Sequence, residues 1–548
     1  MIEYLGKAVY ESIAIGPVCL LEKKKKRITD ARAESVGEEA EKFNAARAAA
    51  KADLEKLYES TLKRAGVSQA EIFQIHIMMV DDLDFEDAVM AKINEGFNAA
   101  YAVSTAAEEL ASMFSAMDDE YMQGRANDVM DISGRITDHI CGVTGDVSLD
   151  SPAIVVAEDV NPSEIVGFES GKLLGLVTSK GSVSSHMAII ARSMSLPCVV
   201  ATGVKMDKSY EGKTAIIDGY KGKIIIDPTE KQLKDYTRRL EKQRADEAFR
   251  RSLIGRENVS ADGKRMEIYC NIGKSKDVSA ALENDAHGIG LMRSEFLYLD
   301  SSDYPSEDYQ FNEYRATLEA MAGKPVIIRT MDIGADKKVD YFNLPEEENP
   351  AMGLRSVRIC FERPEIMKTQ LRALYRASVY GKLKIMVPMI ISADEVRWVK
   401  KMAFEVRNEL KAEGIPFDDK VEIGIMVETP AAAVISDELA EIADFFSIGS
   451  NDLTQYTLAI DRQNSRLENL FDPRHKAVLR LIKTVVDNAH AKGKWVGLCG
   501  ELGKNTELTE FFLAIGLDEV SVSAPYVLKV REKLLSIDSS NIDISKYI

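Results

Sequence analysis

The chain has 548 residues, which is too many for one ordinary hydrophobic core and predicts about two to four domains. Hydrophobic residues make up 45% of it and charged residues 29%, as in a soluble globular protein, and no stretch approaches the roughly 20 apolar residues of a membrane-spanning helix. A formal net charge of -18 argues against nucleic acid or an anionic membrane as the partner, and six scattered cysteines without a C-x-x-C pair predict reduced thiols in the cytoplasm.

The first part of the chain changes from strand to helix. A short pair of strands is predicted at Ala8–Tyr10 and Ala14–Leu21. From about 30 to 142, apolar residues recur at helical spacing, which predicts an all-helical bundle of long hairpins. Its methionines are predicted to lie in the core, and an adaptable protein-binding surface is the other interpretation. The predicted interruptions are three glycines, Gly66, Gly96 and Gly124.

Strand character returns at about residue 146. Glycines and Asp-Gly turns separate the apolar runs there. The predicted strands are Ala153–Val156, Leu173–Val177, Cys198–Val200, Thr214–Asp218 and Lys223–Ile226. The helical block therefore looks inserted into an α/β domain that is formed by both of its flanks.

One segment of this domain places a histidine at the predicted start of a helix. The Gly/Ser loop Gly181-Ser-Val-Ser-Ser precedes His186, and an apolar-periodic run follows it. Because a helix N-terminus favours an anion, His186 could hold a phosphoryl group there; a histidine that merely caps or packs is the alternative. The segment resembles the phosphohistidine signature of phosphoenolpyruvate-utilising phosphotransferases, which favours the first role. The apolar run consists of Met187, Ile190, Ala191 and Met194.

A connector follows this domain. Residues 229 to 257 are highly charged, and a single apolar stripe runs through them. This pattern predicts a helix between domains rather than a disordered tail. The stripe consists of Leu233, Tyr236, Leu240 and Phe249.

From about residue 262 onward, short apolar runs alternate with long helical patterns. About eight such strand–helix units predict a (β/α)8 barrel, in which chemistry takes place at the C-terminal ends of the strands. The predicted strands are Met266–Ile272, Gly288–Met292, Val326–Met331, Leu383–Met389, Ile423–Val427, Phe445–Ile448, Trp495–Cys499 and Glu519–Val522.

Polar or reactive side chains come directly after five of these strands, where a core would accept none. Because the strand ends of a barrel converge on one face, these side chains predict one site rather than separate structural ion pairs. They are Arg293 and Glu295, Arg329 and Asp332, Glu428, Asn451 and Asp452, and Cys499 and Glu501.

The residue types indicate enol-phosphate chemistry. Two carboxylates supply oxygen ligands suited to Mg²⁺ or Mn²⁺. Arginines offer planar forks for a carboxylate or phosphate, and a thiol in such a pocket can be tuned for proton transfer. The two carboxylates are those of Glu428 and Asp452, and the thiol is that of Cys499. The arginines are Arg293, Arg329 and Arg462.

Six motifs follow one another along the predicted barrel. They are Gly288-Ile-Gly-Leu-Met-Arg-Ser-Glu-Phe-Leu297, Ile328-Arg-Thr-Met-Asp-Ile-Gly-Ala-Asp-Lys337, Glu347-Glu-Asn-Pro-Ala-Met-Gly-Leu-Arg355, Gly424-Ile-Met-Val-Glu-Thr-Pro430, Gly449-Ser-Asn-Asp-Leu-Thr-Gln-Tyr456 and Gly497-Leu-Cys-Gly-Glu501. In number and order they resemble one family, Enzyme I of the bacterial phosphotransferase system, and the resemblance covers nearly the whole chain.

The resemblance implies a multidomain α/β fold. It consists of a swivelling phosphohistidine β/α domain with an inserted α-helical bundle, a connector helix and a C-terminal (β/α)8 TIM barrel. The implied domains are 1–28 with 143–228 (phosphohistidine), 29–142 (HPr-binding), 229–257 (linker helix) and 258–548 (phosphoenolpyruvate binding and dimerisation).

The resemblance also implies the reaction. Phosphoenolpyruvate would bind in the barrel mouth, His186 would attack its phosphorus, and Cys499 would protonate the departing enolate to give pyruvate. The phosphocarrier protein HPr, docked near Ile72 to Asp87, would accept the phosphoryl group as the first step of sugar uptake. A cytoplasmic homodimer is implied, with no nucleic acid and no membrane insertion. The implied substrate ligands are Arg293, Arg329, Asn451, Asp452 and Arg462, with Lys337 and Arg355 as secondary candidates, and the implied ligands of Mg²⁺ (or Mn²⁺) are Glu428 and Asp452.

The positions at which the chain departs from the family's motifs lie next to functional residues more often than at the functional residues themselves. Ser182 replaces a usual glycine, and Met187 replaces a hydroxyl residue that could hydrogen-bond the histidine or its phosphate. The other departures are Ala335 for glycine, Leu354 for tryptophan and Tyr10-Glu11-Ser12 for Ser-Pro-Gly.

Two other functions compete with this reading. A dikinase or synthase that makes phosphoenolpyruvate from pyruvate and ATP would need a nucleotide-binding domain, for which residues 1–145 are too short and too helical. A degenerate homologue kept as a regulatory binding protein would explain the departures at Ser182, Met187 and Ala335. Against it, every residue with an assigned chemical role is present.

Overall fold

The structure is a computed structural model that describes residues 1–548 apart from 22–27, 29, 31, 65–66, 117–119, 143–148, 170, 184, 335–336, 338 and 465. Gly66 and Ala335, on which two of the expectations rest, lie outside the described residues. Internal contacts divide the chain into two compact units, Met1–Ala245 and Asp246–Ile548.

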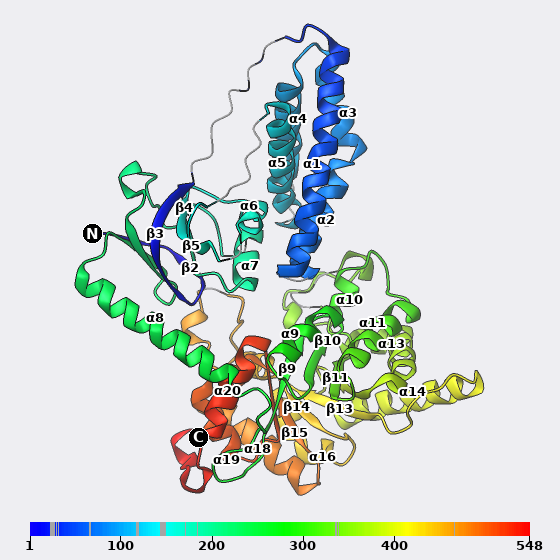
Figure 1. Ribbon diagram of the computed structural model, residues 1–548. Helices are drawn as coiled ribbons and strands as arrows, with labels where there is room; N and C mark the ends of the chain where they lie inside the picture. The colour runs from blue at the N-terminus through cyan, green and yellow to red at the C-terminus, as the bar shows by residue number, and fades with distance from the viewer. Residues whose placement is uncertain are drawn as a thin grey trace. The chain divides into compact units, whose positions relative to one another are not determined.

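A mixed sheet forms the α/β part of the first unit (Figure 1). Across the sheet, its described strands are β1 (Ile2–Leu5), β8 (Lys223–Ile226), β7 (Thr214–Asp218), β3 (Ile13–Leu21), β4 (Ala153–Ala157), β5 (Leu173–Thr178), β6 (Cys198–Val200) and β2 (Lys7–Tyr10). All the strands predicted for this domain form, but the two N-terminal strands do not pair with each other. Instead β2 pairs with β6, and β3 pairs with β4 and β7.

The helical block is inserted between two neighbouring strands. β3 and β4 lie side by side in parallel, with Val18 opposite Ile154 and Leu21 opposite Ala157, although the whole block separates them in the sequence. A parallel pair needs a long crossover connection, and the block provides it. The predicted insertion is confirmed.

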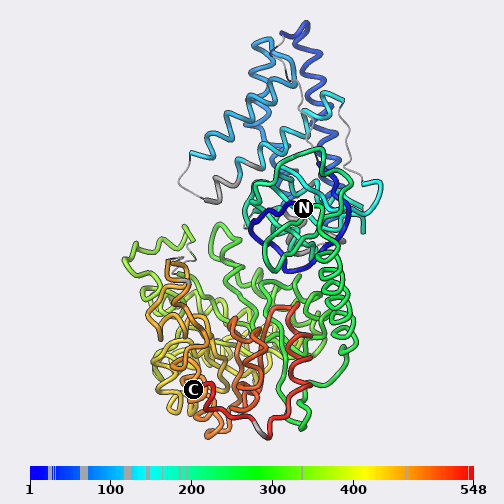
Figure 2. Tube along the Cα trace, turned by 90° about the vertical axis from the view of Figure 1, so that its left-hand side faces the viewer, coloured from blue at the N-terminus to red at the C-terminus, as the bar shows by residue number. Residues whose placement is uncertain are grey.

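Long helices lying side by side make up the inserted block (Figures 1 and 2). They are α1 (Val36–Arg64), α2 (Val67–Val80), α3 (Leu83–Asn94), α4 (Ala99–Ser115) and α5 (Glu120–Ile140). Gly96, at φ +88, follows the end of α3 as predicted, whereas Gly124 lies inside α5, so that interruption is wrong. One interior glycine costs a helix only about 1 kcal/mol, which the packing of α5 on α4 offsets.

The α-helices described in the rest of this part of the chain are α6 (Pro162–Gly167), α7 (His186–Ser193) and the connector α8 (Glu230–Arg251). Tyr236 of α8 packs against the sheet and donates a hydrogen bond to the buried Asp218 at 2.7 Å, and Arg239 lies 3.0 Å from the same carboxylate. The predicted connector helix is confirmed. Phe249 is 54% exposed, so its place in the predicted apolar stripe is wrong.

The second unit is a closed parallel barrel (Figure 1). Every predicted barrel strand forms within two residues of its expected ends, and the fold class is confirmed. In the described chain the strands are β9 (Glu267–Ile272), β10 (Ile289–Arg293), β11 (Pro325–Arg329), β12 (Lys382–Val387), β13 (Glu422–Val427), β14 (Phe446–Ile448), β15 (Val496–Leu498) and β16 (Glu519–Val522).

Helices surround the barrel. Because successive side chains of a strand point to opposite faces, the hydrophobic core has one part inside the barrel and another between the strands and the helices. On β11, Val326 and Ile328 pack outward against helices, while Ile327 packs inside the barrel. The described helices are α9 (Val278–Glu283), α10 (Glu295–Leu299), α11 (Glu307–Ala320), α12 (Val357–Glu362), α13 (Pro364–Ala377), α14 (Ala393–Ala412), α15 (Pro430–Val434), α16 (Ser436–Leu439), α17 (Ser450–Leu458), α18 (Lys476–Ala491), α19 (Thr509–Ala514) and α20 (Ala524–Leu535). Among the described helices, none combines the length and apolar content needed to cross a bilayer.

Candidate active site

The barrel brings most of the predicted site residues to one face. Arg293 and Arg329 are the last residues of the neighbouring strands β10 and β11, and Glu428 and Cys499 directly follow β13 and β15. Asp452 lies in the first turn of α17, just after β14. Because all these strands are parallel, their carboxyl ends meet at one mouth.

A buried ion network fixes the arginine at the end of β11. Arg329, only 6% exposed, contacts Glu295 and lies 3.1 Å from Asp332. Lys337 lies 2.8 Å from Glu295 and 3.2 Å from Asp332, and Arg355 lies 3.0 Å from Asp332. Burial opposes charge on these groups, but their opposite charges prevail, so the pKa values of both carboxyls are lowered and those of both guanidinium groups are raised. The network therefore stays charged at neutral pH.

Sequence reasoning assigned Arg329 to the substrate and did not recognise Glu295 and Asp332 as its partners. The signal in the sequence that could have indicated these partners is their position, since each acid follows a strand that ends in arginine. Arg329 and Arg355 each keep one buried Nε without a hydrogen-bond partner in the described structure. These atoms remain free to donate to a ligand.

Two other guanidinium groups have no hydrogen-bond or ion-pair partner among the described residues. Arg293 is half-buried at the end of β10. Arg462 is exposed, and its backbone amide donates to Gln455 Oε1 at 3.1 Å. Both groups are thus available to an anion, and their assignment to the substrate stays a prediction.

Two carboxylates form the acidic part of the mouth. Glu428 is 1% exposed, accepts a 2.7 Å hydrogen bond from the Met389 amide, and has its pKa raised to about 8 by burial and then by the negative charges of Asp452 and Asp332. A divalent cation would relieve this repulsion, and Mg²⁺ typically uses only one or two protein carboxylates. The pair therefore fits such an ion. In the described part of the chain no cluster of three or more metal-ligating side chains forms an all-protein site.

The loop after β15 is held against α17. Asn451 Oδ1 accepts the Glu501 amide at 3.0 Å, and Ser450 Oγ accepts the Leu502 amide at 3.3 Å. A Cβ at Gly500 would lie 2.0 Å from Ser450 Oγ, so this approach requires glycine. The Glu501 side chain is exposed and lies 2.6 Å from Lys504, so it is already paired at the face where the sequence predicts it.

Cys499 lies at the top of the barrel interior. It is 3% exposed, and its Sγ lies 3.8 Å from the Ile448 carbonyl oxygen. Burial raises the pKa of the thiol to about 12. The thiol is therefore protonated at neutral pH and suited to donating a proton rather than to acting as a thiolate nucleophile.

Two residues that contact or adjoin the candidate site have a strained backbone. Met389, whose amide holds Glu428, has φ +59, and Ser356, next to Arg355, has φ +56. Side chains other than glycine rarely adopt this region, and such residues cluster at functional sites.

His186 is the first residue of α7, as the sequence predicts. Ser185 caps the helix, and its Oγ accepts a hydrogen bond from the Ala188 amide at 3.2 Å. Gly181, at φ +101, provides the backbone turn before it. Met187 is 3% exposed and packs in the core, so this departure from the motif replaces a polar group with buried apolar contacts. The His186 side chain lies outside the described part of the chain.

Replacing Arg329 with leucine should destabilise the barrel by about 3–5 kcal/mol, because two buried carboxylates lose their main partner. Both tryptophans of the chain, Trp398 and Trp495, belong to the barrel unit, so their fluorescence during urea unfolding reports this unit alone. The control is Arg397→Leu, which removes an exposed ion pair with Asp394 and should change stability by less than about 1 kcal/mol. Equal effects of the two substitutions would contradict a structural role for the network.

Comparison with known proteins extends these observations. Three family models match the chain: "PEP-utilising enzyme, PEP-binding domain" over residues 250–539, "PEP-utilising enzyme, N-terminal" over 5–125 and "PEP-utilising enzyme, mobile domain" over 149–222. The chain is 40% identical to the phosphoenolpyruvate-protein phosphotransferase of Priestia megaterium over 99% of its own length and 95% of the relative's. It is 43% identical to that of Geobacillus stearothermophilus, over 96% of its own length and 92% of the relative's.

Proposed function

The chain belongs to the family of phosphoenolpyruvate–protein phosphotransferases, and we propose that it moves the phosphoryl group of phosphoenolpyruvate to His186 and then to HPr, releasing pyruvate. The observation that carries this proposal is the convergence of free guanidinium groups, a buried carboxylate pair and a protonated thiol at one barrel mouth. These are the groups that an enol phosphate needs for binding and for protonation of its enolate.

The arginines hold the substrate in this proposal. Phosphoenolpyruvate has a carboxylate and a phosphate, and Arg293 and Arg462 have no described partner that would compete for them. Arg329 is already fixed by Glu295 and Asp332, so it needs little reorganisation when charge develops on the phosphoryl group. Asn451 uses its Oδ1 to hold the loop after β15, which leaves its amide hydrogens for the ligand.

Glu428 and Asp452 are the proposed metal ligands. Enzymes of this family need a divalent metal ion, and the two carboxylates suit Mg²⁺, with Mn²⁺ as the alternative. When bound, the ion would neutralise negative charge on the phosphoryl and enolate oxygens. Glu428 must be ionised to bind the ion, and Asp452 lies 3.8 Å from the Arg355 guanidinium group.

His186 is the proposed nucleophile. His186 is the first residue of α7, and the N-terminus of a helix favours an anion such as a phosphoryl group, which supports this role. His186 belongs to the first unit and the barrel to the second, so the units must approach for the first transfer and separate for the second. We assign the hinge to α8, the helix in which the two units meet along the sequence.

Replacing Cys499 with alanine should slow pyruvate formation about 10²–10⁴-fold, the usual contribution of a positioned acid, and leave phosphoenolpyruvate binding unchanged. Because the pKa of the thiol is raised to about 12, the acid form persists through the neutral and mildly alkaline range. The kcat should therefore not fall between about pH 7 and 9 through loss of this proton. Pyruvate formation that is unchanged in the variant would contradict the acid role. Cys141→Ala, at an exposed cysteine, is the control.

HPr is proposed to dock on the helical block. A small cavity of about 120 Å³ lies between helices there, with apolar walls that include Phe85, Leu110 and Phe114 and with Asp82 and Asp84 at its edge. Met78 and Leu83 beside it in the sequence are 68% and 72% exposed. An apolar hollow with an acidic rim suits a partner with a basic surface around an apolar centre.

Reversing one of these charges with Asp84→Lys should raise the KM for HPr about tenfold and leave phosphorylation of His186 by phosphoenolpyruvate unchanged, because Asp84 is exposed and lines the proposed docking cavity rather than the barrel mouth. Steady-state assays at varied HPr concentration measure the first quantity, and single-turnover labelling measures the second. Glu41→Lys reverses an exposed charge on α1 away from the cavity and should leave both at the wild-type level. Equal KM values for Asp84→Lys and Glu41→Lys would contradict this docking site.

We further propose a homodimer in the cytoplasm, formed through the barrel as in the family that the sequence resembles. All six thiols are free, as a reducing compartment requires. Exposed apolar side chains on the barrel unit, among them Met352, Val434 and Leu470, are available to an interface.

Pyruvate release tests the proposed function against its competitors. Phosphoenolpyruvate and Mg²⁺ should give sustained pyruvate formation only when HPr is also present. Formation that requires AMP and phosphate instead would indicate a synthase, and formation that requires AMP and pyrophosphate would indicate a dikinase. A folded protein that makes no pyruvate under either condition would indicate a regulatory homologue.

A further inference from the structure

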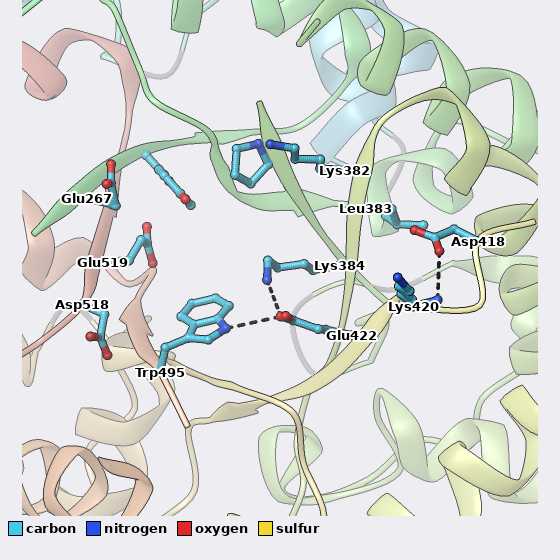
Figure 3. Close-up of a pocket in the computed structure, with 12 residues that line it drawn as sticks. Glu267, Lys382, Leu383, Lys384, Asp418, Lys420, Glu422, Trp495, Asp518 and Glu519 are labelled. Carbon is cyan, nitrogen blue, oxygen red and sulfur yellow. Dashed lines mark hydrogen bonds and ion pairs between the residues drawn. The ribbon is translucent and has the colours of Figure 1, made fainter. Parts of the chain in front are cut away.

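A cavity of about 480 Å³ opens at the amino-terminal ends of the barrel strands, at the end of the barrel opposite the candidate active site (Figure 3). Residues from β9, β12, β13 and β16 line it, together with Trp495 just before β15. Its volume falls in the range of small-molecule sites, about 300–1,000 Å³. None of its lining residues takes part in the proposed reaction.

The inner wall of this cavity contains a buried acid without a partner. Glu519, the first residue of β16, is 2% exposed, and neither of its carboxylate oxygens has a hydrogen-bond partner in the described structure. The nearby Leu498 amide falls short of a normal hydrogen bond, although it slightly favours the charged form of the acid. Burying such a group without a partner is costly, which points to a partner that the chain itself does not supply.

Two glycines provide the space for this carboxylate. A Cβ at Gly497 would lie 2.0 Å from Glu519 Oε2, and one at Gly290 would lie 2.6 Å from its Oε1. These glycines belong to β15 and β10, on the two sides of the acid. The barrel is therefore shaped around a carboxylate at this position.

The other acids on the same wall already have partners. Glu267 lies 3.0 Å from His287, and Asp518 lies 2.8 Å from His490. Glu519 alone on this wall has no cation beside it among the described residues. Burial and the charge of Glu267 raise the pKa of Glu519 well above the usual value, so the neutral acid is favoured unless a positive group lies beside it.

The opposite wall presents ammonium groups. In the closed barrel β12 and β13 lie across the ring from β9 and β16, and Figure 3 shows the lysines on the side away from Glu267, Glu519 and Asp518. Lys384 contacts Glu422 and lies 4.9 Å above the Trp495 ring. Lys382 and Lys420 are exposed and have no ion-pair partner in the described chain, although the Lys420 amide donates to Asp418 at 2.9 Å.

We propose that this cavity binds a small zwitterion, an amino acid or a short ω-amino acid, whose ammonium group pairs with Glu519 and whose carboxylate pairs with Lys382 and Lys420. An ammonium group beside Glu519 would restore the negative charge of this acid, and the opposite wall carries ammonium groups of its own, which favours a dipolar ligand over an ion of one sign. The aromatic rings of Tyr269 and Trp495, both in the lining, offer apolar surface to the carbon chain between the two charges.

Calorimetric titration of the full chain with glycine, γ-aminobutyrate, lysine and ε-aminocaproate tests the proposal. Trp495 fluorescence in a Trp398→Phe background gives a second readout at the cavity itself. Hexylammonium and hexanoate are the matched ligands that lack one charge each. At least one zwitterion should bind, and each single-charge analogue should bind about tenfold or more weakly, the equivalent of one lost ion pair.

Two variants locate the binding. Glu519→Gln keeps the shape of the acid and should weaken zwitterion binding about tenfold or more, and Lys382→Ala, at an exposed residue, should do the same from the opposite wall. Lys411→Ala, at an exposed lysine of α14, is the matched control and should bind like the wild type. Phosphorylation of each variant by phosphoenolpyruvate shows that its barrel is folded. Absence of binding by all four zwitterions, unchanged binding in Glu519→Gln and Lys382→Ala, or equal affinity for hexylammonium would overturn the proposal.

Discussion

Replacing His186 with alanine is expected to abolish the phosphoenzyme and, with it, all transfer to HPr. No other residue is proposed to accept the phosphoryl group, so the loss should be complete rather than partial. The fold should survive, because alanine favours a helix and the Ser185 cap is retained at the start of α7. Intact-mass measurement after incubation with phosphoenolpyruvate and Mg²⁺ detects the phosphoenzyme directly.

His490→Ala is the matched control. It also removes a histidine, but His490 is 40% exposed and its partner Asp518 is a surface acid. This variant should form phosphoenzyme like the wild type. A His186→Ala protein that still carries phosphohistidine would remove the central residue of the proposed mechanism.

Replacing Glu428 with glutamine should lower the kcat for pyruvate formation about 10²–10³-fold, as expected when a group that stabilises transition-state charge is lost. Glutamine can still accept the Met389 hydrogen bond through its carbonyl oxygen, and it removes the repulsion from Asp452. The fold should therefore be retained while the metal loses one of its two proposed ligands. Pyruvate formation at varied Mg²⁺ concentration should show both a lower kcat and a higher metal requirement.

The control for this variant is Glu501→Gln. Glu501 follows β15 at the same end of the barrel, but its side chain is exposed and pairs with Lys504. Its replacement should leave kcat and the metal requirement close to wild type. Similar losses in the two variants would show that negative charge in general at this face, rather than the buried pair, supports activity.

Elements with strong local patterns could be predicted from the sequence. The apolar runs of the barrel strands and the helical spacing of the inserted block are local signals, and both are confirmed. The pairing of β2 with β6 depends on contacts between residues far apart in the chain, so the local pattern suggested the wrong neighbour. Gly124 inside α5 shows the same limit, because tertiary packing offset a weak local helix preference.

The site was predictable as a set of residue types but not as a set of partners. Position after a strand placed Arg329 and Asp332 on one face, yet only the structure shows that they bind each other. The sequence likewise gave no sign that Glu501 would be exposed while Glu428 would be buried. The sequence predicts Glu519 only as the first residue of a strand, because its burial without a partner depends on two glycines from other strands.

Radiolabelled phosphoenolpyruvate tests the central claim most directly. The purified protein is incubated with it and Mg²⁺, with and without HPr, and the label is examined for acid lability and mapped to peptides. The account predicts acid-labile label on the peptide that contains His186, which moves to HPr when HPr is added. A folded protein that takes up no label, or that holds it on another residue, would contradict the account.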